Sequence, residues 1–194
     1  MLNRFVARHT NISSQRLKRP AKMLQQYERE AVAKAIEWYR ERKLRVYDKV
    51  LTLSGILSII RENAAKSKPN KYIAIIDYIG LVKVENSRAQ RWEQIGQISR
   101  ELKIMANEYN VPIVVLAQLN RDVNANQQPQ LSNLRDSGSI EQDSNVVAFL
   151  HRPYKDDPKV VQLTIQKNRE GALGTIDYYF EGRYMTFIEP NNEE

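Results

Sequence analysis

Two continuous apolar runs on either side of a helical pattern constrain the fold of this chain more than any other feature. Residues 72–76 and 111–117 have the composition of strands that are buried on both faces of a sheet. The segment between them, from about residue 88 to 109, carries apolar side chains at three- and four-residue intervals, namely Trp92, Ile95, Ile98, Leu102 and Met105. A right-handed crossover makes the two strands parallel. Asp77 and Gln118 are therefore predicted at one edge of the sheet, where open α/β sheets bind ligands.

The remaining segments predict helices before this β-α-β unit and antiparallel strands after it. Helices are expected over residues 1–10, over 24–42 after a break at Pro20, and from Thr52 or Ser54 to about 65. Strands are expected at 45–47, 146–150, 160–167, 175–180 and 184–188. The predicted fold class is α/β, with a mainly parallel sheet and a C-terminal antiparallel β-meander in a single domain over residues 1–194.

Length and composition predict a globular chain without disulfides. The 194 residues, of which 42% are hydrophobic, are enough for one well-cored domain and few for two. The apolar runs are too short to cross a bilayer and no signal-peptide core is visible, so we expect a cytoplasmic location and no membrane partner. With no cysteine and two histidines, the chain would bind a metal through oxygen. The net charge of +7 favours a polyanionic partner.

Two polar side chains at the predicted sheet edge have the chemistry of a nucleotide site. An aspartate after a buried strand, such as Asp77, is what P-loop ATPases use to hold the water shell of Mg²⁺. The side-chain amide of Gln118 has the groups needed to sense a γ-phosphate or to orient water. The alternatives stay open at this point: Asp77 as a cap for loop amides and Gln118 as an ordinary hydrogen-bonding residue.

A phosphate-binding loop is missing from this sequence. Such a loop needs closely spaced glycines followed by Gly-Lys-Ser or Gly-Lys-Thr at the start of a helix, so that backbone amides and the lysine surround the phosphates. None of the seven glycines precedes a lysine. The stretch from Gly171 to Gly174 lies in a predicted hairpin and contains no lysine. We therefore expect no ATP hydrolysis by this chain alone.

Four stretches follow one another in an order and at spacings that match a known family. They are residues 75–81 (IIDYIGL), 98–103 (ISRELK), 116–121 (LAQLNR) and 134–143 (LRDSGSIEQD). These stretches resemble the successive motifs of DnaB-like replicative DNA helicases. The resemblance extends more weakly back to residues 2–5 and forward through 167–171 to the final strands, so it covers nearly the whole chain. It implies a RecA-like P-loop NTPase core.

The family resemblance implies roles for residues at a nucleotide site. Asp77 is similar to the acidic residue on the magnesium side, which acts through water, and Gln118 to the residue that links nucleotide state to the DNA loops. Lys167 and Arg169 resemble the basic pair that reaches as a finger into a neighbouring subunit and stabilises charge on the transferring phosphate. Without the family, both would be interpreted as exposed charges at a hairpin tip.

A second set of residues resembles the loop that holds single-stranded DNA in the family. Arg135, Asp136 and Gly138 match that loop, with Gly138 letting the main chain approach phosphates closely, and Arg121 adds charge nearby. Asp136 stands where the family often has glutamate, which has a longer side chain. Because no aromatic residue lies between 119 and 142, contact with the DNA backbone is expected and base stacking is not.

The first residues depart from the family pattern. In the family, residues 2–4 correspond to a helix that follows both the phosphate-binding loop and the strand with the catalytic glutamate. The resemblance implies a full-length parent with ATP and Mg²⁺ as cofactors, working as a hexameric ring that unwinds DNA 5′ to 3′ and contacts primase and a loader. We expect neither cofactor to bind tightly to this chain. The phosphate-binding loop and the strand with the catalytic glutamate are both missing from this sequence, and two strands of the central sheet are missing with them. Their absence should leave apolar surface and strand edges uncovered and favour self-association or rearrangement of residues 1–45.

Three other interpretations of the sequence remain. The chain could be a non-catalytic protein that docks on helicase rings or single-stranded DNA, or a recombinase-type RecA relative. The third takes Asp77, Asp136 and Asp143 as a two-metal nuclease cluster, although the last two lie in the DNA-loop motif.

Overall fold

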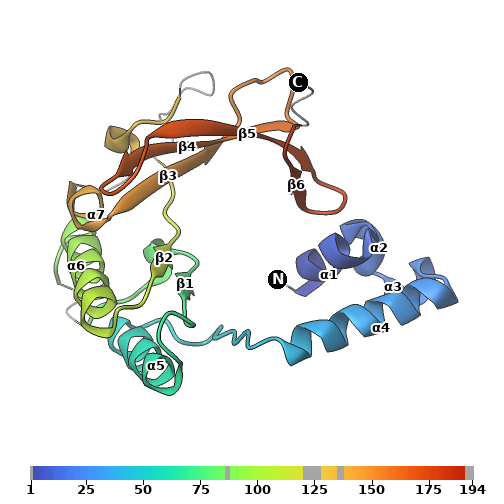
Figure 1. The fold of residues 1–194 in the computed structure, drawn as a ribbon, viewed down its shortest axis with the longest axis horizontal. Helices are drawn as coiled ribbons and strands as arrows, with labels where there is room; N and C mark the ends of the chain where they lie inside the picture. Colours follow the sequence, from blue (N-terminus) through green and yellow to red (C-terminus); the bar gives the residue numbers. More distant parts are fainter. Residues whose placement is uncertain (1, 86–87, 120–127, 135–137, 191–194) are drawn as a thin grey trace. The chain divides into compact units, whose positions relative to one another are not determined.

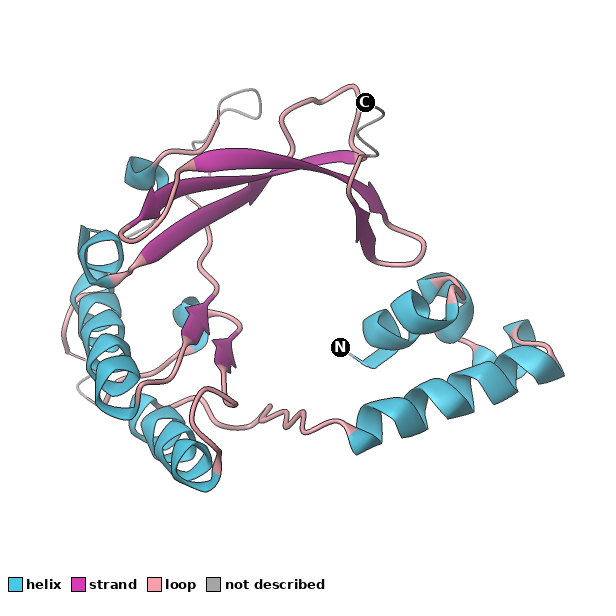
Figure 2. Ribbon diagram, in the orientation of Figure 1, coloured by secondary structure: helices cyan, strands magenta, loops and turns pink. Residues whose placement is uncertain are grey.

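The computed structural model, drawn in Figure 1, describes residues 2–85, 88–119, 128–134 and 138–190. These residues form two compact units. The first unit contains Met1–Val46, Leu150–Leu163 and Thr175–Glu194, and the second contains Tyr47–Phe149 and Thr164–Gly174. Helices and strands alternate in the middle of the chain, whereas strands dominate its last part (Figure 2). The α/β fold class is confirmed. The assignment of residues 1–194 to a single domain stays a prediction.

The first unit begins with four helices, α1 (Leu2–Thr10), α2 (Ser14–Leu17), α3 (Pro20–Met23) and α4 (Gln26–Glu41). Both predicted long helices are present, and Pro20 opens α3, a position where its missing N–H costs nothing. Their apolar side chains form one cluster, with Val6, Ala7, Ile12, Leu17 and Leu24 buried. The Tyr39 hydroxyl donates to the Phe5 carbonyl at 3.2 Å, which ties α4 to α1.

The second unit contains the predicted β-α-β arrangement. Strand β1 (Ala74–Ile76) pairs in parallel with β2 (Ile113–Val115), with Ile75 opposite Val114. The connection runs through the 3₁₀ turn η1 (Ile79–Leu81) and helix α6 (Arg91–Tyr109). Helix α5 (Leu53–Lys66), capped by Thr52 as expected, packs with α6 on this sheet. The core includes Ile60 of α5 and Ile95, Ile98, Leu102 and Met105 of α6.

Three sequence expectations for these elements are wrong. The two parallel strands are not buried on both faces, since Ile75 is 65% and Val114 42% exposed, because α5 and α6 cover one face only. Trp92 does not join the apolar stripe: it lies in the first turn of α6, 55% exposed, and its indole N–H donates to Gln90 Oε1 at 3.1 Å. Residues 45–47 have no strand conformation, and Val46 is 60% exposed.

The chain ends in the expected antiparallel β-meander. Its strands are β3 (Val146–His151), β4 (Val160–Asn168), β5 (Gly174–Glu181) and β6 (Thr186–Ile188), which lie in that order in the sheet. Before them come the 3₁₀ turn η2 (Leu131–Asn133) and the short helix α7 (Gly138–Asp143). In β3, Val147 and Phe149 are buried together with Leu134, whereas Val146 and Leu150 point to the other face and are exposed.

The expectation of uncovered apolar surface in the second unit is confirmed. Ile73 and Leu116 are 52% and 45% exposed beside Ile75 and Val114 on the two parallel strands. Among the described helices, none is both long and apolar enough to span a membrane.

Candidate functional site

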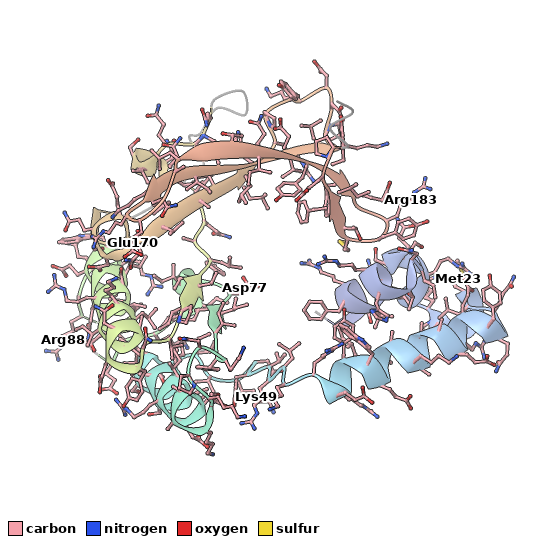
Figure 3. All side chains as sticks on the ribbon, in the orientation of Figure 1. Met23, Lys49, Asp77, Arg88, Glu170 and Arg183 are labelled. Atoms are coloured by element: carbon pink, nitrogen blue, oxygen red, sulfur yellow. The ribbon has the colours of Figure 1, made fainter. Side chains whose placement is uncertain are left out.

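Asp77 and Gln118 lie at the same edge of the parallel sheet, as the crossover predicts. Asp77 follows β1 directly, as Figure 3 shows, and Gln118 comes three residues after the end of β2. The two segments stay paired beyond the strands, because Leu116 N donates to the Ile76 carbonyl and Ile79 N donates to the Leu116 carbonyl, both at 2.9 Å. Both side chains are exposed. The edge is therefore open to a ligand from solvent.

The Asp77 carboxylate does not cap the loop that follows it. Within the part of the chain that the structure describes, no hydrogen bond reaches this carboxylate, so its oxygens are available to a metal-bound water. The loop is held instead by Arg91, whose guanidinium donates to the carbonyls of Gly80 at 2.9 Å, Val82 at 3.3 Å and Ile79 at 3.4 Å. Arg91 is not among the residues predicted from the sequence. The feature of the sequence that could have identified it is a cation at the first position of a helix, where the helix dipole disfavours positive charge.

Gln118 is next to the start of the predicted DNA loop. Leu119 and Leu134 form an isolated antiparallel bridge, so the segment after β2 runs beside the residue that precedes Arg135. Leu134 is 7% exposed and packs with Val147 and Phe149, which fixes this end of the loop. The bridge therefore connects the sheet edge that carries Asp77 and Gln118 to the residue before the predicted DNA loop.

Most of the predicted DNA-binding residues lie outside the described residues, namely Arg121, Arg135 and Asp136. Gly138 is described: it is the first residue of α7 and is exposed. A Cβ at this position would meet none of the described atoms within 4 Å, and its φ is not in the left-handed region. Packing against the described residues therefore does not require glycine here.

Lys167 and Arg169 meet at the C-terminal end of α7. The Lys167 ammonium donates to the Glu141 carbonyl, and Arg169 Nη2 donates to the Gln142 carbonyl at 2.8 Å. Lys167 is half-buried at the end of β4, and Arg169 is exposed just beyond it, next to the Glu170 labelled in Figure 3. The structure thus brings the two predicted finger cations to one place and gives them fixed partners, unlike unrestrained charges at a hairpin tip.

The residues present fit one part of a Mg²⁺ site but not a bound nucleotide. Asp77 can supply one carboxylate to the water shell of Mg²⁺, whereas the sequence has no Gly-Lys-Ser or Gly-Lys-Thr to surround phosphates. Among the described residues, no three histidine or acidic side chains gather in a way that would hold a metal directly. Of the nuclease cluster considered from the sequence, Asp136 lies outside the described residues.

Comparison with known proteins points to one family. The chain matches the DnaB-like helicase C-terminal domain over residues 1–189. It is 40% identical over 116 residues to the replicative DNA helicase DnaB of Treponema pallidum, covering 60% of this chain and 26% of that protein. Against DnaB of Mycoplasma pneumoniae it is 35% identical over 170 residues, covering 79% of this chain and 36% of that one. The chain thus spans about a third of the length of these relatives or less.

Solved structures support the same assignment. One solved ATPase domain superposes with a TM-score of 0.90 at 30% identity, over 98% of this chain and 70% of that one. A DnaB-like replicative helicase, solved in a study of its interactions with primase, gives 0.89 at 29% identity, over 98% and 48%. The RadB recombinase shares only the fold, with a TM-score of 0.54, 12% identity and coverage of 98% and 74%. The chain belongs to the DnaB-like helicase C-terminal domain family.

Proposed function

We propose that this chain is part of the motor of a cytoplasmic, hexameric replicative helicase that unwinds DNA 5′ to 3′ with ATP. The bridge between Leu119 and Leu134 is the observation that carries the proposal, because it links the segment after Gln118 to the residue before the proposed DNA loop. A motor that moves on DNA needs such a connection, since nucleotide state must change the position of groups that hold DNA.

In this proposal the chain contributes two halves of different nucleotide sites. Asp77 holds the water shell of Mg²⁺ on the chain's own side, and Gln118 transmits the state of the nucleotide toward the loop. Lys167 and Arg169 serve the site of a neighbouring copy, where positive charge stabilises the transferring phosphoryl group. In a complete site, hydrolysis of bound ATP would supply the free energy for movement, with Mg²⁺ neutralising charge on the phosphates. The phosphate-binding loop has to come from residues outside this sequence.

Single-stranded DNA is the proposed substrate, held through its phosphates. The net charge of +7 supports a polyanion, and Arg121, Arg135 and the Gly138 main chain are the proposed contacts. Further copies of the chain are proposed as ring partners, and primase and a loader as transient ones. For primase, the support is that a structural relative was solved in a study of its interactions with primase.

The DNA part of the proposal is tested with the isolated chain and a fluorescent oligothymidine of about 20 nucleotides, longer than the site of a single binding module. Fluorescence anisotropy should show binding that weakens with salt. Arg135→Ala should lower the affinity and reduce the slope of log K against log salt by about one, the effect of losing one phosphate contact. The matched control is Arg40→Ala, which removes the same charge from an exposed position on α4. Equal effects of the two variants would contradict a specific DNA loop.

The nucleotide part is tested separately by calorimetry with ATP and Mg²⁺. The isolated chain should give no measurable heat of binding, because Asp77 and Gln118 without a phosphate-binding loop cannot surround the phosphates. Micromolar affinity for ATP would contradict the proposal that this chain holds only half of a nucleotide site.

A further inference from the structure

The last turn of α7 binds both proposed finger cations. A helix leaves its final carbonyls without intrahelical partners and carries partial negative charge at that end. The carbonyls of Glu141 and Gln142 are two of these groups, and they accept from Lys167 and from Arg169 respectively. The main chain adds a third link, because Arg169 N donates to the Asn145 carbonyl at 3.1 Å just after the helix. Three bonds therefore tie the end of β4 to residues 141–145.

Helix α7 is itself held against α6. Gly96 of α6 is so close to α7 that a Cβ there would lie 3.2 Å from Ser139 Oγ and 3.5 Å from Ser139 Cβ. Ile140 packs against the buried residues of the β-α-β core and also against the Leu134 cluster. Lys103, two turns further along α6, donates to Asn145 Oδ1. Apolar packing of Ile140, the close approach at Gly96 and the polar contact of Lys103 just after the helix thus set the position of α7.

We infer that α7 is the support that positions the finger cations, and that Gly96, Lys103 and Asn145 are positioning residues for them. This inference rests on the proposed function and deepens it. Lysine has three N–H donors and arginine five, and the carbonyls of Glu141 and Gln142 use one side-chain donor of each. The orientation of each cationic side chain is therefore fixed, while its remaining N–H donors can bind phosphate oxygens, as preorganised charge requires.

Site-resolved acetylation of lysines measures this support in the chain as it exists. N-hydroxysuccinimide acetate reacts with amines, and mass spectrometry reads each lysine separately. Lys167 should react roughly tenfold slower than Lys68, an exposed lysine in the turn after α5, because a charge-assisted hydrogen bond has to break first. Equal rates for these two lysines would overturn the inference.

Gly96→Ala tests whether α6 sets the position of α7. Alanine has a higher helix propensity than glycine, so the variant should not unfold at a lower temperature. Its Cβ nevertheless pushes Ser139, shifts α7 and should speed acetylation of Lys167 several-fold, approaching the rate of Lys68. Adding Ser139→Ala removes the oxygen 3.2 Å away and should restore slow acetylation. A simple loss of stability cannot be reversed in this way.

Lys103→Met tests the contact between Lys103 and Asn145. Its control is Lys34→Met, which changes an exposed lysine of α4. Only Lys103→Met should speed acetylation of Lys167. The inference is overturned if Gly96→Ala leaves the rate at Lys167 unchanged, if Ser139→Ala does not reverse its effect, or if both methionine variants act alike. These rates do not depend on DNA or ATP, so a failure here is distinct from a failure of the proposed function, which the DNA and ATP measurements detect.

Discussion

Glu28 is a buried carboxylate whose charge supports the helices of the first unit. Its side chain is bound by the Gln25 backbone N–H at 2.9 Å and by both terminal nitrogens of Arg16. The hydrogen bond from Gln25, and then the bond and charge of Arg16, hold the pKa of Glu28 below its usual value, against the opposing effect of burial. A carboxyl with a lowered folded pKa stabilises the fold above its unfolded pKa of about 4.3 and loses that contribution as the pH falls through the folded value.

Glu28→Gln should therefore lower the melting temperature at neutral pH and have little effect at a pH well below the unfolded pKa. The neutral amide keeps the shape but gives Arg16 no charge to pair with. Thermal unfolding followed by circular dichroism at both pH values measures the difference. The control is Glu30→Gln on the exposed side of the same helix. If Glu28→Gln lowers the melting temperature by the same amount in acid, the variant has lost packing and not a charge interaction.

Gly138→Ala separates a ligand requirement from a folding requirement. Because a Cβ at position 138 meets none of the described atoms within 4 Å, the free energy of unfolding should change by less than about 0.5 kcal/mol. If the main chain at Gly138 approaches DNA phosphates, the methyl group should weaken oligothymidine binding by roughly tenfold, the cost of one charge-assisted hydrogen bond. The matched control is Gly174→Ala, which also has nothing within 4 Å. Unchanged DNA affinity in both variants would remove Gly138 from the proposed contact.

At the scale of elements, periodicity predicted the β-α-β unit correctly but not which faces are covered. The stripe of α6 from Ile95 to Met105 and the strands that end before Asp77 and Gln118 are all present. An apolar run is equally compatible with one or two covered faces, so the exposure of Ile75 could not be inferred from it. The contacts that fix the candidate site are backbone carbonyls accepting from Arg91, Lys167 and Arg169, and carbonyls carry no sequence signal.

Arg91→Met tests how α6 holds the loop after Asp77. The variant keeps the aliphatic stem but loses donors to three loop carbonyls, so it should lower the free energy of unfolding by about 2 kcal/mol, as for hydrogen bonds to a charged group. Urea denaturation measures this loss, and hydrogen exchange should quicken at the amides of η1. Arg100→Met, at an exposed position of the same helix, is the control and should do neither.

At the scale of the whole molecule, the motif order predicted the family, whereas the division into two units was not foreseen. Motifs record which residues meet a ligand, and Asp77, Gln118 and Lys167 keep their spacing whether or not the sheet around them is continuous. The structure has a two-stranded parallel sheet and a separate four-stranded one, a separation that depends on backbone pairing. Pairing between distant segments is set by tertiary context, which a local pattern does not contain.

The uncovered face of the two-stranded sheet should make the chain self-associate. Ile73, Ile75, Val114 and Leu116 lie on or beside β1 and β2 and are each more than 40% exposed. Among the described strands, β1 and β2 pair with each other alone, so backbone N–H and C=O groups remain at the edges of their sheet. Contact between two such faces buries apolar area and satisfies edge groups at the same time. Association should therefore increase with protein concentration and, since apolar contact dominates, persist at high salt.

Ile75→Lys should weaken this association by at least about tenfold, because burial of one isoleucine contributes about 1.5–3 kcal/mol and a buried lysine adds a desolvation cost. Sedimentation velocity over a range of concentrations gives the dissociation constant of each variant. The control is Leu173→Lys, which places the same charge at an exposed apolar residue of the same unit away from the two strands. If both variants weaken association equally, added charge explains the effect. A monomer at all concentrations in the unaltered chain would show that exposed apolar area on β1 and β2 is insufficient to drive pairing.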